Sequence, residues 1–333
     1  MKRIVKVLIV FDVIIGICFF LTYGPIKYFR EFLITTAMTT KSHKYLAKTF
    51  YSDKMINKVL NSNYVPGFDE DTNPDEIVIG GNNDGHYSSV YEKEILDRKK
   101  GADYKLIEFK HNGYKVYLTA IYDPSKVSLA GTSYLGTNGE LLTEIAEKNN
   151  AKVAVNAGGF YDPSGTGNGG VPMGGMIQNG KVVWNGGGFG TLVGFNKDNI
   201  LVSIKDTPEN AVKKGMRDAV QFGPTLIMNG KAAEIVGNGG WGINPRTAIA
   251  QRKDGIVLFL IVDGNGTKYN LNGRGGVTMN ELIEILLRYG AYNAANMDGG
   301  ASTTFAVEGK LYNKPCAYTN DGQRGLPNAW VLK

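Results

Sequence analysis

Cysteine and histidine are scarce in this 333-residue chain, and where they lie excludes several kinds of site. Of the two cysteines, Cys18 lies in an apolar N-terminal run and Cys316 stands alone near the C-terminus, so no disulfide within a folded domain is expected. The three histidines, His43, His86 and His111, lie outside the polar clusters described below. A Ser-His-Asp triad and a histidine-ligated zinc site are therefore not expected. Catalysis has to use carboxylates, arginine and hydroxyl groups.

A phosphate-binding nucleotide loop is also missing. The glycine-rich stretch from Gly165 to Gly175 lacks the G-x-x-x-x-G-K-[ST] pattern, so it is not read as a P-loop. Two hypotheses remain for the role of this stretch: a flexible lid over a site, or a loop without a function.

The net charge of +6 is distributed unevenly along the chain. Residues 1–60 carry +7, residues 61–104 carry −6 and residues 105–333 carry +5. The basic excess lies beside the apolar N-terminal run, where it would meet anionic lipid. Nucleic acid is therefore not expected as a partner.

The N-terminal run over residues 4–21 predicts a transmembrane helix. Eighteen helical residues span about 27 Å, close to the thickness of the hydrocarbon core of a bilayer. Asp12 costs on the order of 3 kcal/mol there, which the other side chains outweigh. No A-x-A cleavage pattern follows, so we expect a retained single-pass anchor rather than the alternative, a cleaved signal peptide. Lys2 and Arg3 on the inside place the rest of the chain outside the cell.

Four segments are predicted. Residues 1–25 form the anchor, and residues 26–60 form an amphipathic juxtamembrane helix that lies on lipid or binds a partner. Residues 61–104 form an acidic linker, either solvated or draped over the domain in extended form. Residues 105–333 form one catalytic domain.

The catalytic segment has the pattern of an α+β fold, a mixed, largely antiparallel sheet with helices packed on it. Alternating residues around Asn112-Gly113 predict a hairpin over 105–122, and similar turn signals recur later in the chain. Helices are expected over 141–149 and 280–289. The second helix begins just after Thr278, which together with Glu281 has the spacing of a capping box.

Polar clusters follow three strong strand patterns. The first is VNAGGFYD at 155–162, the second runs from Arg246 to Asp263, and the third is NMDGGASTTF at 296–305. A strand that ends in Asp-Gly-Gly presents a carboxylate on rigid backbone, while the glycines let a ligand approach the main chain. Ordinary turns are the alternative for each cluster taken alone.

Six motifs in order resemble the phosphodiester glycosidase family, which includes the uncovering enzyme of the lysosomal pathway and bacterial exopolysaccharide-related proteins. The resemblance covers about residues 150–333 and rests on VNAGGFYD, QFGPTLIMNGK, NPRTAIAQ, LFLIVDGNG, NMDGGASTTF and RGLPNAW. It implies hydrolysis of the bond between the anomeric carbon of a sugar and a phosphodiester. Two departures are Ala301, in place of a third glycine, and Asn265, in place of a basic residue for which Arg274 would have to compensate.

The resemblance implies catalytic roles for Asp298, Asp263 and Arg246. The planar guanidinium groups of Arg246 and Arg324 are suited to donate paired hydrogen bonds to the phosphate oxygens. Asp298 stabilises the oxocarbenium-like centre or activates water, and Asp263 is the second carboxylate. A separation of about 5 Å between them favours a covalent intermediate, and one of about 6.5 to 9.5 Å an inverting attack by water.

The remaining predicted positions bind substrate. They are Asn156, Gly158, Gly159, Thr247, Glu281, Gly299, Gly300, Ser302, Thr303 and Arg324. Structural roles are the alternative for several of these positions: a helix cap for Glu281, a buried ion pair for Arg246, and turn ordering for Asn156, Ser302 and Thr303.

The sequence thus predicts an extracytoplasmic hydrolase of glycosyl phosphodiesters or phosphate-containing polysaccharides, in the metabolism of a bacterial cell wall or exopolysaccharide. The alternatives are a catalytically silent, membrane-tethered glycan-binding module and an assembly factor that recruits a partner through residues 26–60. The sequence identifies no cofactor with certainty. Calcium stays open because Asp, Asn and carbonyl oxygens are its ligands, although no EF-hand spacing is present.

Overall fold

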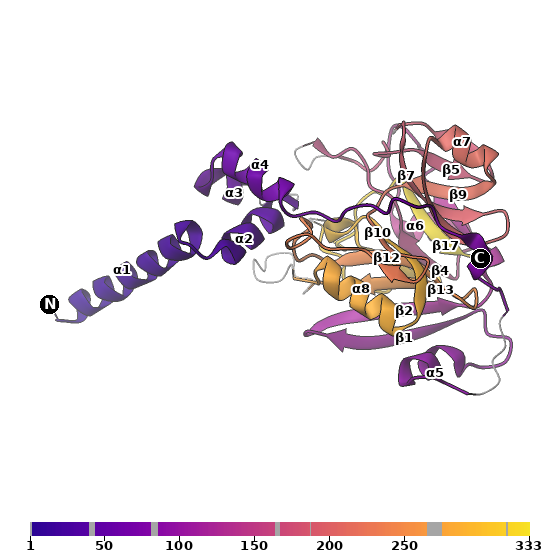
Figure 1. Ribbon diagram of the computed structural model, residues 1–333, viewed down its shortest axis with the longest axis horizontal. Coiled ribbons are helices and arrows are strands. Elements are labelled where there is room, and N and C mark those ends of the chain that lie inside the picture. Colours follow the sequence, from indigo (N-terminus) through magenta and orange to yellow (C-terminus); the bar gives the residue numbers. More distant parts are fainter. Residues whose placement is uncertain are drawn as a thin grey trace. The chain divides into compact units, whose positions relative to one another are not determined.

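The computed structural model describes residues 2–39, 44–80, 86–163, 167–186, 188–264, 275–317 and 319–333. The chain divides into two compact units (Figure 1). The helical unit comprises Met1–Val65 and Ile235–Gly242, and the sheet unit comprises Pro66–Glu234 and Ile243–Lys333.

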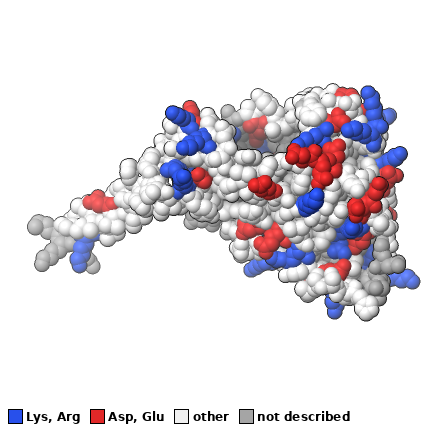
Figure 2. All heavy atoms as spheres, in the orientation of Figure 1, with Lys and Arg blue, Asp and Glu red and all other residues white. Residues whose placement is uncertain are grey.

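The first helix has the length and composition of a membrane span. Within α1 (Lys2–Tyr23), Ile4–Tyr23 is long and apolar enough to cross a membrane, and most of its large apolar side chains are exposed. No other helix among the described residues passes this test. Figure 2 shows α1 as largely free of charged side chains. A signal sequence passes the same test, so the helix is confirmed and its retention in the membrane stays a prediction.

Residues 26–60 form three helices instead of the single helix we expected: α2 (Lys27–Thr39), α3 (Lys44–Phe50) and α4 (Asp53–Asn61). Two of the helix starts have local causes. Proline at position 25 precedes α2, and the side chain of Ser52 caps α4 by accepting a hydrogen bond from the Met55 amide. The helices bury a small hydrophobic core against one another. Its buried members are Ile34, Ala37, Ala47, Tyr51, Ile56 and Val59.

Three sheets build the sheet unit, and every described strand pair in them is antiparallel. The first, in spatial order, contains β1 (Tyr104–His111), β2 (Tyr114–Ile121), β13 (Val257–Val262), β12 (Arg246–Arg252), β14 (Ala291–Asn296), β10 (Thr225–Met228) and β11 (Lys231–Ala232). The second contains β16 (Lys310–Leu311), β15 (Phe305–Val307), β4 (Val153–Asn156), β17 (Asn328–Leu332) and β3 (Val127–Gly131). The third contains β6 (Lys181–Trp184), β5 (Met176–Gln178), β9 (Met216–Gln221), β7 (Gly190–Asn196) and β8 (Leu201–Asp206).

One hydrophobic core joins the three sheets, because each contributes large buried side chains to it, among them Phe259, Trp330 and Phe195. Helices cover other faces. α6 (Leu142–Lys148) packs on the second sheet, α7 (Pro208–Lys213) on the third and α8 (Met279–Arg288) on β10 and β14 of the first. The predicted α+β class, the antiparallel pairing and both predicted helices are confirmed.

The predicted hairpin over 105–122 is also confirmed, with His111 opposite Tyr114. Its two turn residues, Asn112 and Gly113, have φ of 49° and 86°, the left-handed backbone that Asn-Gly adopts readily.

The acidic segment belongs to the sheet unit from residue 66 onward, in the draped form that was one of our two expectations. Thr72 and Ser203 exchange hydrogen bonds, from the Thr72 amide to the Ser203 carbonyl (3.2 Å) and from the Ser203 amide to the Thr72 hydroxyl (2.8 Å). The short helices η1 (Pro74–Glu76) and α5 (Val90–Leu96) follow, and Ile77 and Ile95 are buried. The boundary between the units therefore falls after residue 65, about forty residues before the predicted start of the catalytic domain.

Candidate active site

The predicted site positions gather where the ends of strands from two sheets meet. Arg246 begins β12 opposite Val262, near the end of β13, and β12 also pairs with the end of β14. In the second sheet Asn156 ends β4. Hydrogen bonds join the sheets at this edge: the Thr247 hydroxyl donates to Asn156 Oδ1 (2.7 Å), and the Asp298 amide donates to the carbonyl of residue 157 (2.9 Å). All three polar clusters therefore contribute to one place.

Asn156 is the buried link between the two sheets. Its Nδ2 donates to the Asp298 carbonyl (2.6 Å), and its Oδ1 accepts from Thr247 and from the Thr304 amide (3.1 Å). Neither Asn156 nor Thr247 is exposed, and each uses its polar group on protein. They hold the Asp298 loop in place, which is a structural role for Asn156 but not the expected ordering of the Gly158-Gly159 turn.

Asp298 lies at the turn from β14 into η4 (Gly300–Ser302). Desolvation by the surrounding protein raises the pKa of its carboxyl group to about 6, although solvent still reaches part of the side chain. A hydrogen bond from Ser302 and the nearby charge of Arg324 act in the opposite direction. A carboxyl group with a pKa near neutrality can exchange protons with a bound substrate or water.

The two glycines after Asp298 are needed for a close backbone approach. A Cβ at Gly299 would lie 2.8 Å from the Pro245 carbonyl oxygen, which accepts a hydrogen bond from the Gly300 amide (2.9 Å). Gly300 also has a φ of 62°. The glycines therefore fit the Asp298 loop against the segment that leads into β12.

Arg246 is next to this loop. The residue is 2% exposed, its Nε donates to the Val277 carbonyl (3.1 Å), and its Nη1 lies 3.8 Å from where a Gly299 Cβ would be. Burial lowers the pKa of Arg246 to about 9, and the charge of Glu281 opposes this shift. The structure thus places a buried guanidinium and the Asp298 loop on the same side of the molecule.

Arg324 brings a second carboxylate, Asp162, into the site. The two side chains form an ion pair (Nη2 to Oδ2, 2.7 Å), and the guanidinium lies 4.2 Å from the centre of the Phe160 ring. Both residues act on Asp298, because the charge of Arg324 lowers its pKa and that of Asp162 raises it. Asp162 was not predicted as a site residue, although it ends the first polar motif, and that position was the available signal.

Asp263 is held by the fold rather than presented to solvent. It is 4% exposed, its Oδ1 accepts from Asn313 Nδ2 (2.8 Å) and its Oδ2 from the Lys314 amide (3.1 Å). Tyr117 also bonds to it, and burial raises the pKa of Asp263. These contacts are those of a residue that organises the chain after β15, and they favour a structural role over the predicted catalytic one.

We expect Asp263→Asn to destabilise the protein by about 2 to 3 kcal/mol, because the new amide group faces a donor where an oxygen accepted before. Urea denaturation measures the change. Activity per folded molecule should stay within about threefold of the wild type. Unchanged stability together with lost turnover would instead return Asp263 to the catalytic role predicted from the sequence.

Three further predicted positions have local structural roles. The Gly158 amide donates to Asn328 Oδ1 (2.7 Å), and a Cβ at Gly159 would lie 2.6 Å from the Phe222 ring. Glu281 completes a capping box at α8, where its Oε2 accepts from the Thr278 amide (2.7 Å). The hydrogen bonds from Thr278 lower the pKa of the Glu281 carboxyl group. A helix-capping role was the alternative prediction for Glu281, and the structure shows this cap.

Thr303 differs from its neighbours because its buried hydroxyl has no hydrogen-bond partner among the described residues. It is 1% exposed and follows Ser302, which bonds to Asp298. A buried hydroxyl without a partner is costly, so this group is suited to a substrate oxygen or an ordered water.

Several expectations concern positions that the structure does not test. Asn265 and Arg274 lie outside the described residues, as do residues 164–166 of the glycine-rich stretch. The described part of that stretch packs closely, since a Cβ at Gly169 would lie 2.1 Å from the Gly325 carbonyl oxygen. Within the described ranges no group of three or more His, Cys, Asp or Glu side chains could hold a metal ion, and a calcium requirement stays a prediction.

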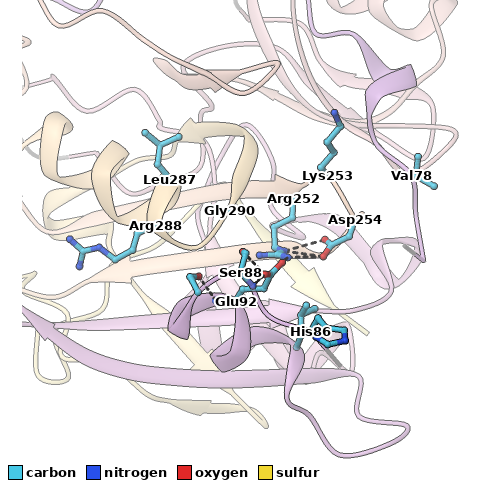
Figure 3. A pocket seen from close by; sticks show the side chains of 12 residues that line it. Val78, His86, Ser88, Glu92, Arg252, Lys253, Asp254, Leu287, Arg288 and Gly290 are labelled. Carbon is cyan, nitrogen blue, oxygen red and sulfur yellow. Dashed lines mark hydrogen bonds and ion pairs between the residues drawn. The ribbon is translucent and has the colours of Figure 1, made fainter. Parts of the chain in front are cut away.

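A cavity of about 630 Å³ lies at the other end of β12, near Arg252 (Figure 3). Figure 3 shows the Arg252 guanidinium directed at Asp254 and Glu92, with distances of 2.8 and 3.5 Å. Its Nη1 also donates to the Tyr289 carbonyl (3.0 Å). The Arg252 guanidinium is therefore held by two carboxylates and a backbone carbonyl of the protein.

The family model described as "Phosphodiester glycosidase" matches residues 149–333, more than half of the chain. The chain belongs to the phosphodiester glycosidase family. The matched residues contain all thirteen predicted site positions, so the resemblance read from the motifs is confirmed. The first helices and the draped segment lie outside the match.

Two curated relatives are 28% identical to this family member over the aligned residues. The SPbeta prophage-derived uncharacterized protein YomE of Bacillus subtilis is 28% identical over 267 residues, 73% of this chain and 38% of that protein. The N-acetylglucosamine-1-phosphodiester alpha-N-acetylglucosaminidase of Bos taurus is 28% identical over 202 residues, 55% of this chain and 36% of that protein. The chain thus spans less than two fifths of the length of these relatives.

A solved structure supports the fold of this family member. It is the zebrafish N-acetylglucosamine-1-phosphodiester alpha-N-acetylglucosaminidase catalytic domain, described as auto-inhibited by its pro-peptide. The likeness has a TM-score of 0.56 and 21% identity, and covers 72% of this chain and 86% of the zebrafish chain.

Proposed function

We propose that the protein hydrolyses the bond between the anomeric carbon of a sugar and a phosphodiester. One observation carries the proposal: the loop of Asp298, whose pKa is raised to about 6, is next to the buried Arg246 guanidinium, and the charge of Arg324 also acts on Asp298. Acid–base chemistry and phosphate recognition are the two things this reaction needs. The names of the mammalian relatives describe the same class of substrate.

In the proposed reaction, Arg246 and Arg324 bind the phosphate oxygens, and the Asp298 carboxylate takes a proton from a water molecule as it attacks the anomeric carbon. The bond from that carbon to the bridging oxygen breaks, and its electron pair stays on the phosphate. The products are a free sugar and a phosphate monoester. Because phosphate is a good leaving group, little protonation of the leaving oxygen is needed.

Asp162 and Ser302 position the reacting groups in this scheme. Asp162 fixes the Arg324 guanidinium through their ion pair, and its Oδ1 accepts from the Gly167 amide (2.6 Å). Ser302 donates to Asp298 and so favours its ionised form. The buried hydroxyl of Thr303 is the group we assign to the sugar.

We infer that α1 is retained as a single-pass anchor and that the catalytic domain faces the outside of the cell, where cell-wall polymers and exopolysaccharides carry glycosyl phosphodiesters. The apolar length of α1 and the basic residues around it support this placement. Carbonate-resistant membrane association, together with digestion of the domain by protease added to intact cells, tests it. A soluble protein shorter by the first helix would identify a cleaved signal peptide instead.

Full-length protein in detergent, incubated with a panel of sugar 1-phosphodiesters with and without calcium, tests the activity. We expect release of free sugar by the wild type and not by Asp298→Asn. Binding of the panel without release by either protein would contradict the hydrolase and support a catalytically silent glycan-binding module.

The pH dependence of the reaction should report Asp298. Because the scheme uses the carboxylate form, kcat/KM should rise about tenfold per pH unit below pH 6 and level off above it. The substrate phosphodiester keeps one negative charge over this range, so its ionisation does not produce the limb. A rate that instead falls above pH 6 would make Asp298 a proton donor and overturn its assigned role.

A further inference from the structure

A short two-stranded ribbon lies next to Asp162. Its strands meet at an antiparallel bridge between Phe160 and Pro172, flanked by hydrogen bonds from the Tyr161 amide (2.8 Å) and the Met173 amide (3.0 Å) to the opposite strand. Side chains alternate between the two faces of such a ribbon. Tyr161 and Met173 therefore share one face, and Phe160 and Pro172 share the other.

The two faces differ in exposure. Phe160 and Pro172 are buried, and the centre of the Phe160 ring lies 4.2 Å from the Arg324 guanidinium. On the other face, the exposed fraction is 65% for Tyr161 and 62% for Met173. One face of the ribbon therefore supports the guanidinium that we assign to the phosphate, and the other presents apolar side chains to solvent.

Phe222 joins this exposed face to the end of β14. A Cβ at Gly159 would lie 2.6 Å from the Phe222 ring and 3.3 Å from Met173 Sδ, so both side chains lie over the same glycine. Phe222 is half-buried against the main core, and the carbonyl of Gly223 accepts a hydrogen bond from Asn296 Nδ2 (3.1 Å). The strand β14 leads into the catalytic loop, so the exposed face continues from the edge of the site. We call these side chains the apolar strip: Tyr161, Val171, Met173 and Phe222.

The composition of the apolar strip favours an apolar ligand. No charged residue occurs in the segments that form it, 157–161, 171–175 and 220–224. Their one amide side chain, Gln221, uses both polar atoms on the backbone, since Oε1 accepts from the Gly175 amide (2.8 Å) and Nε2 donates to the Gly188 carbonyl (3.1 Å). A sugar ring needs hydrogen-bond partners for its hydroxyl groups, whereas a hydrocarbon chain needs only apolar area. An anionic lipid surface would need basic residues, which these segments lack.

We propose that the apolar strip binds the alcohol part of the phosphodiester substrate, and that this part is a long-chain or isoprenoid alcohol. The inference rests on the proposed function, because it assumes that Arg324 binds the phosphate. A hydrocarbon chain on the second ester oxygen of that phosphate passes the edge of the ribbon and lies on Tyr161, Met173 and Phe222. The substrate class is then a sugar joined through one phosphate to a lipid alcohol, and hydrolysis releases free sugar and an alkyl phosphate.

Two substrates with the same sugar test the inference, one with an octyl group and one with a methyl group on the phosphate. The full-length protein is kept in lipid nanodiscs, because detergent would compete for the apolar strip. We expect kcat/KM to be about thirtyfold higher for the octyl substrate, since methylene groups are buried on the strip. By calorimetry, with empty nanodiscs subtracted, octyl phosphate should also bind about thirtyfold more tightly than methyl phosphate.

Met173→Gln and Tyr161→Ser replace exposed side chains, so both variants should fold. Each should lower the octyl-to-methyl ratio of kcat/KM, and that of affinity, by about fivefold, because part of the apolar area is lost. A loss of activity common to both substrates cancels in the ratio. Leu287→Gln is the matched control, because it makes the same kind of change at a 42% exposed side chain of α8, beside the Arg252 cavity (Figure 3). It should leave both ratios unchanged.

An octyl-to-methyl ratio near one in the wild type would overturn the proposal, as would a ratio that neither Met173→Gln nor Tyr161→Ser lowers. Faster turnover of a substrate whose alcohol part is a hexose, lost in the same two variants, would assign the apolar strip to a carbohydrate and also contradict it. If the wild type hydrolyses neither substrate, the proposed function fails by itself. The affinities of the two alkyl phosphates then decide whether the strip binds a hydrocarbon chain.

Discussion

Asp298→Asn is expected to lower kcat/KM by about 10³-fold or more and, at pH 7, to make the folded protein more stable. The loss of rate follows because asparagine has the shape of aspartate but cannot take a proton from water. The gain in stability follows from the raised pKa, about 6 in the folded protein against an ordinary value of 3.8. Folding therefore favours the protonated form, and the stability that this group contributes is lost as the pH rises from about 4 to 6.

Because solvent reaches part of the side chain, we expect the gain in the free energy of unfolding to be about 1 to 2 kcal/mol rather than the full value of the shift. Urea denaturation at pH 7 and at pH 4 measures it, and the difference from the wild type should shrink at the lower pH. Asp198→Asn, at an exposed turn, removes the same charge and should change neither rate nor stability by much. A variant that is inactive and also less stable would indicate that Asp298 supports the fold rather than the chemistry.

Arg246→Lys is expected to lower kcat/KM by about 10²-fold to 10³-fold. Lysine keeps the positive charge but loses the planar fork that can bind two phosphate oxygens at once. It also loses the Nε bond to the Val277 carbonyl that holds the group in place. Inorganic phosphate should inhibit the wild type and inhibit this variant at least tenfold more weakly.

Arg252→Lys is the matched control for Arg246→Lys. Arg252 ends the same strand, is also buried, and likewise donates to a backbone carbonyl, that of Tyr289. Its substitution should reduce stability but leave kcat/KM per folded molecule and phosphate inhibition unchanged. Equal losses of activity in the two variants would show that any buried arginine of β12 supports activity through the fold, and that Arg246 has no special place.

The parts of the fold that the sequence predicted depend on local physics. Asn112 and Gly113 adopt the left-handed backbone that an Asn-Gly turn favours. Thr278 and Glu281 form a capping box whose hydrogen bonds lie within four residues of the chain. The same holds for the Asp298 turn, whose glycines are adjacent in sequence to the carboxylate they accommodate.

The parts that the sequence did not predict depend on distant pairing. Asp162 belongs to the site because Arg324, 162 residues away, pairs with it. The sequence around Asp263 predicts a carboxylate presented at the end of a strand. The Asn313 amide that donates a hydrogen bond to this carboxylate is 50 residues away in the chain. Residues 26–60 have the composition of a surface helix, and the segment that joins them in the helical unit starts only at residue 235.

Hydrolysis of a sugar 1-phosphodiester in water enriched in oxygen-18 tests most directly where the bond breaks. If Asp298 directs water to the anomeric carbon, the released phosphate monoester contains no label by phosphorus NMR, and the sugar, trapped by reduction as it forms, contains it. Label in the phosphate would place the attack on phosphorus and contradict the account.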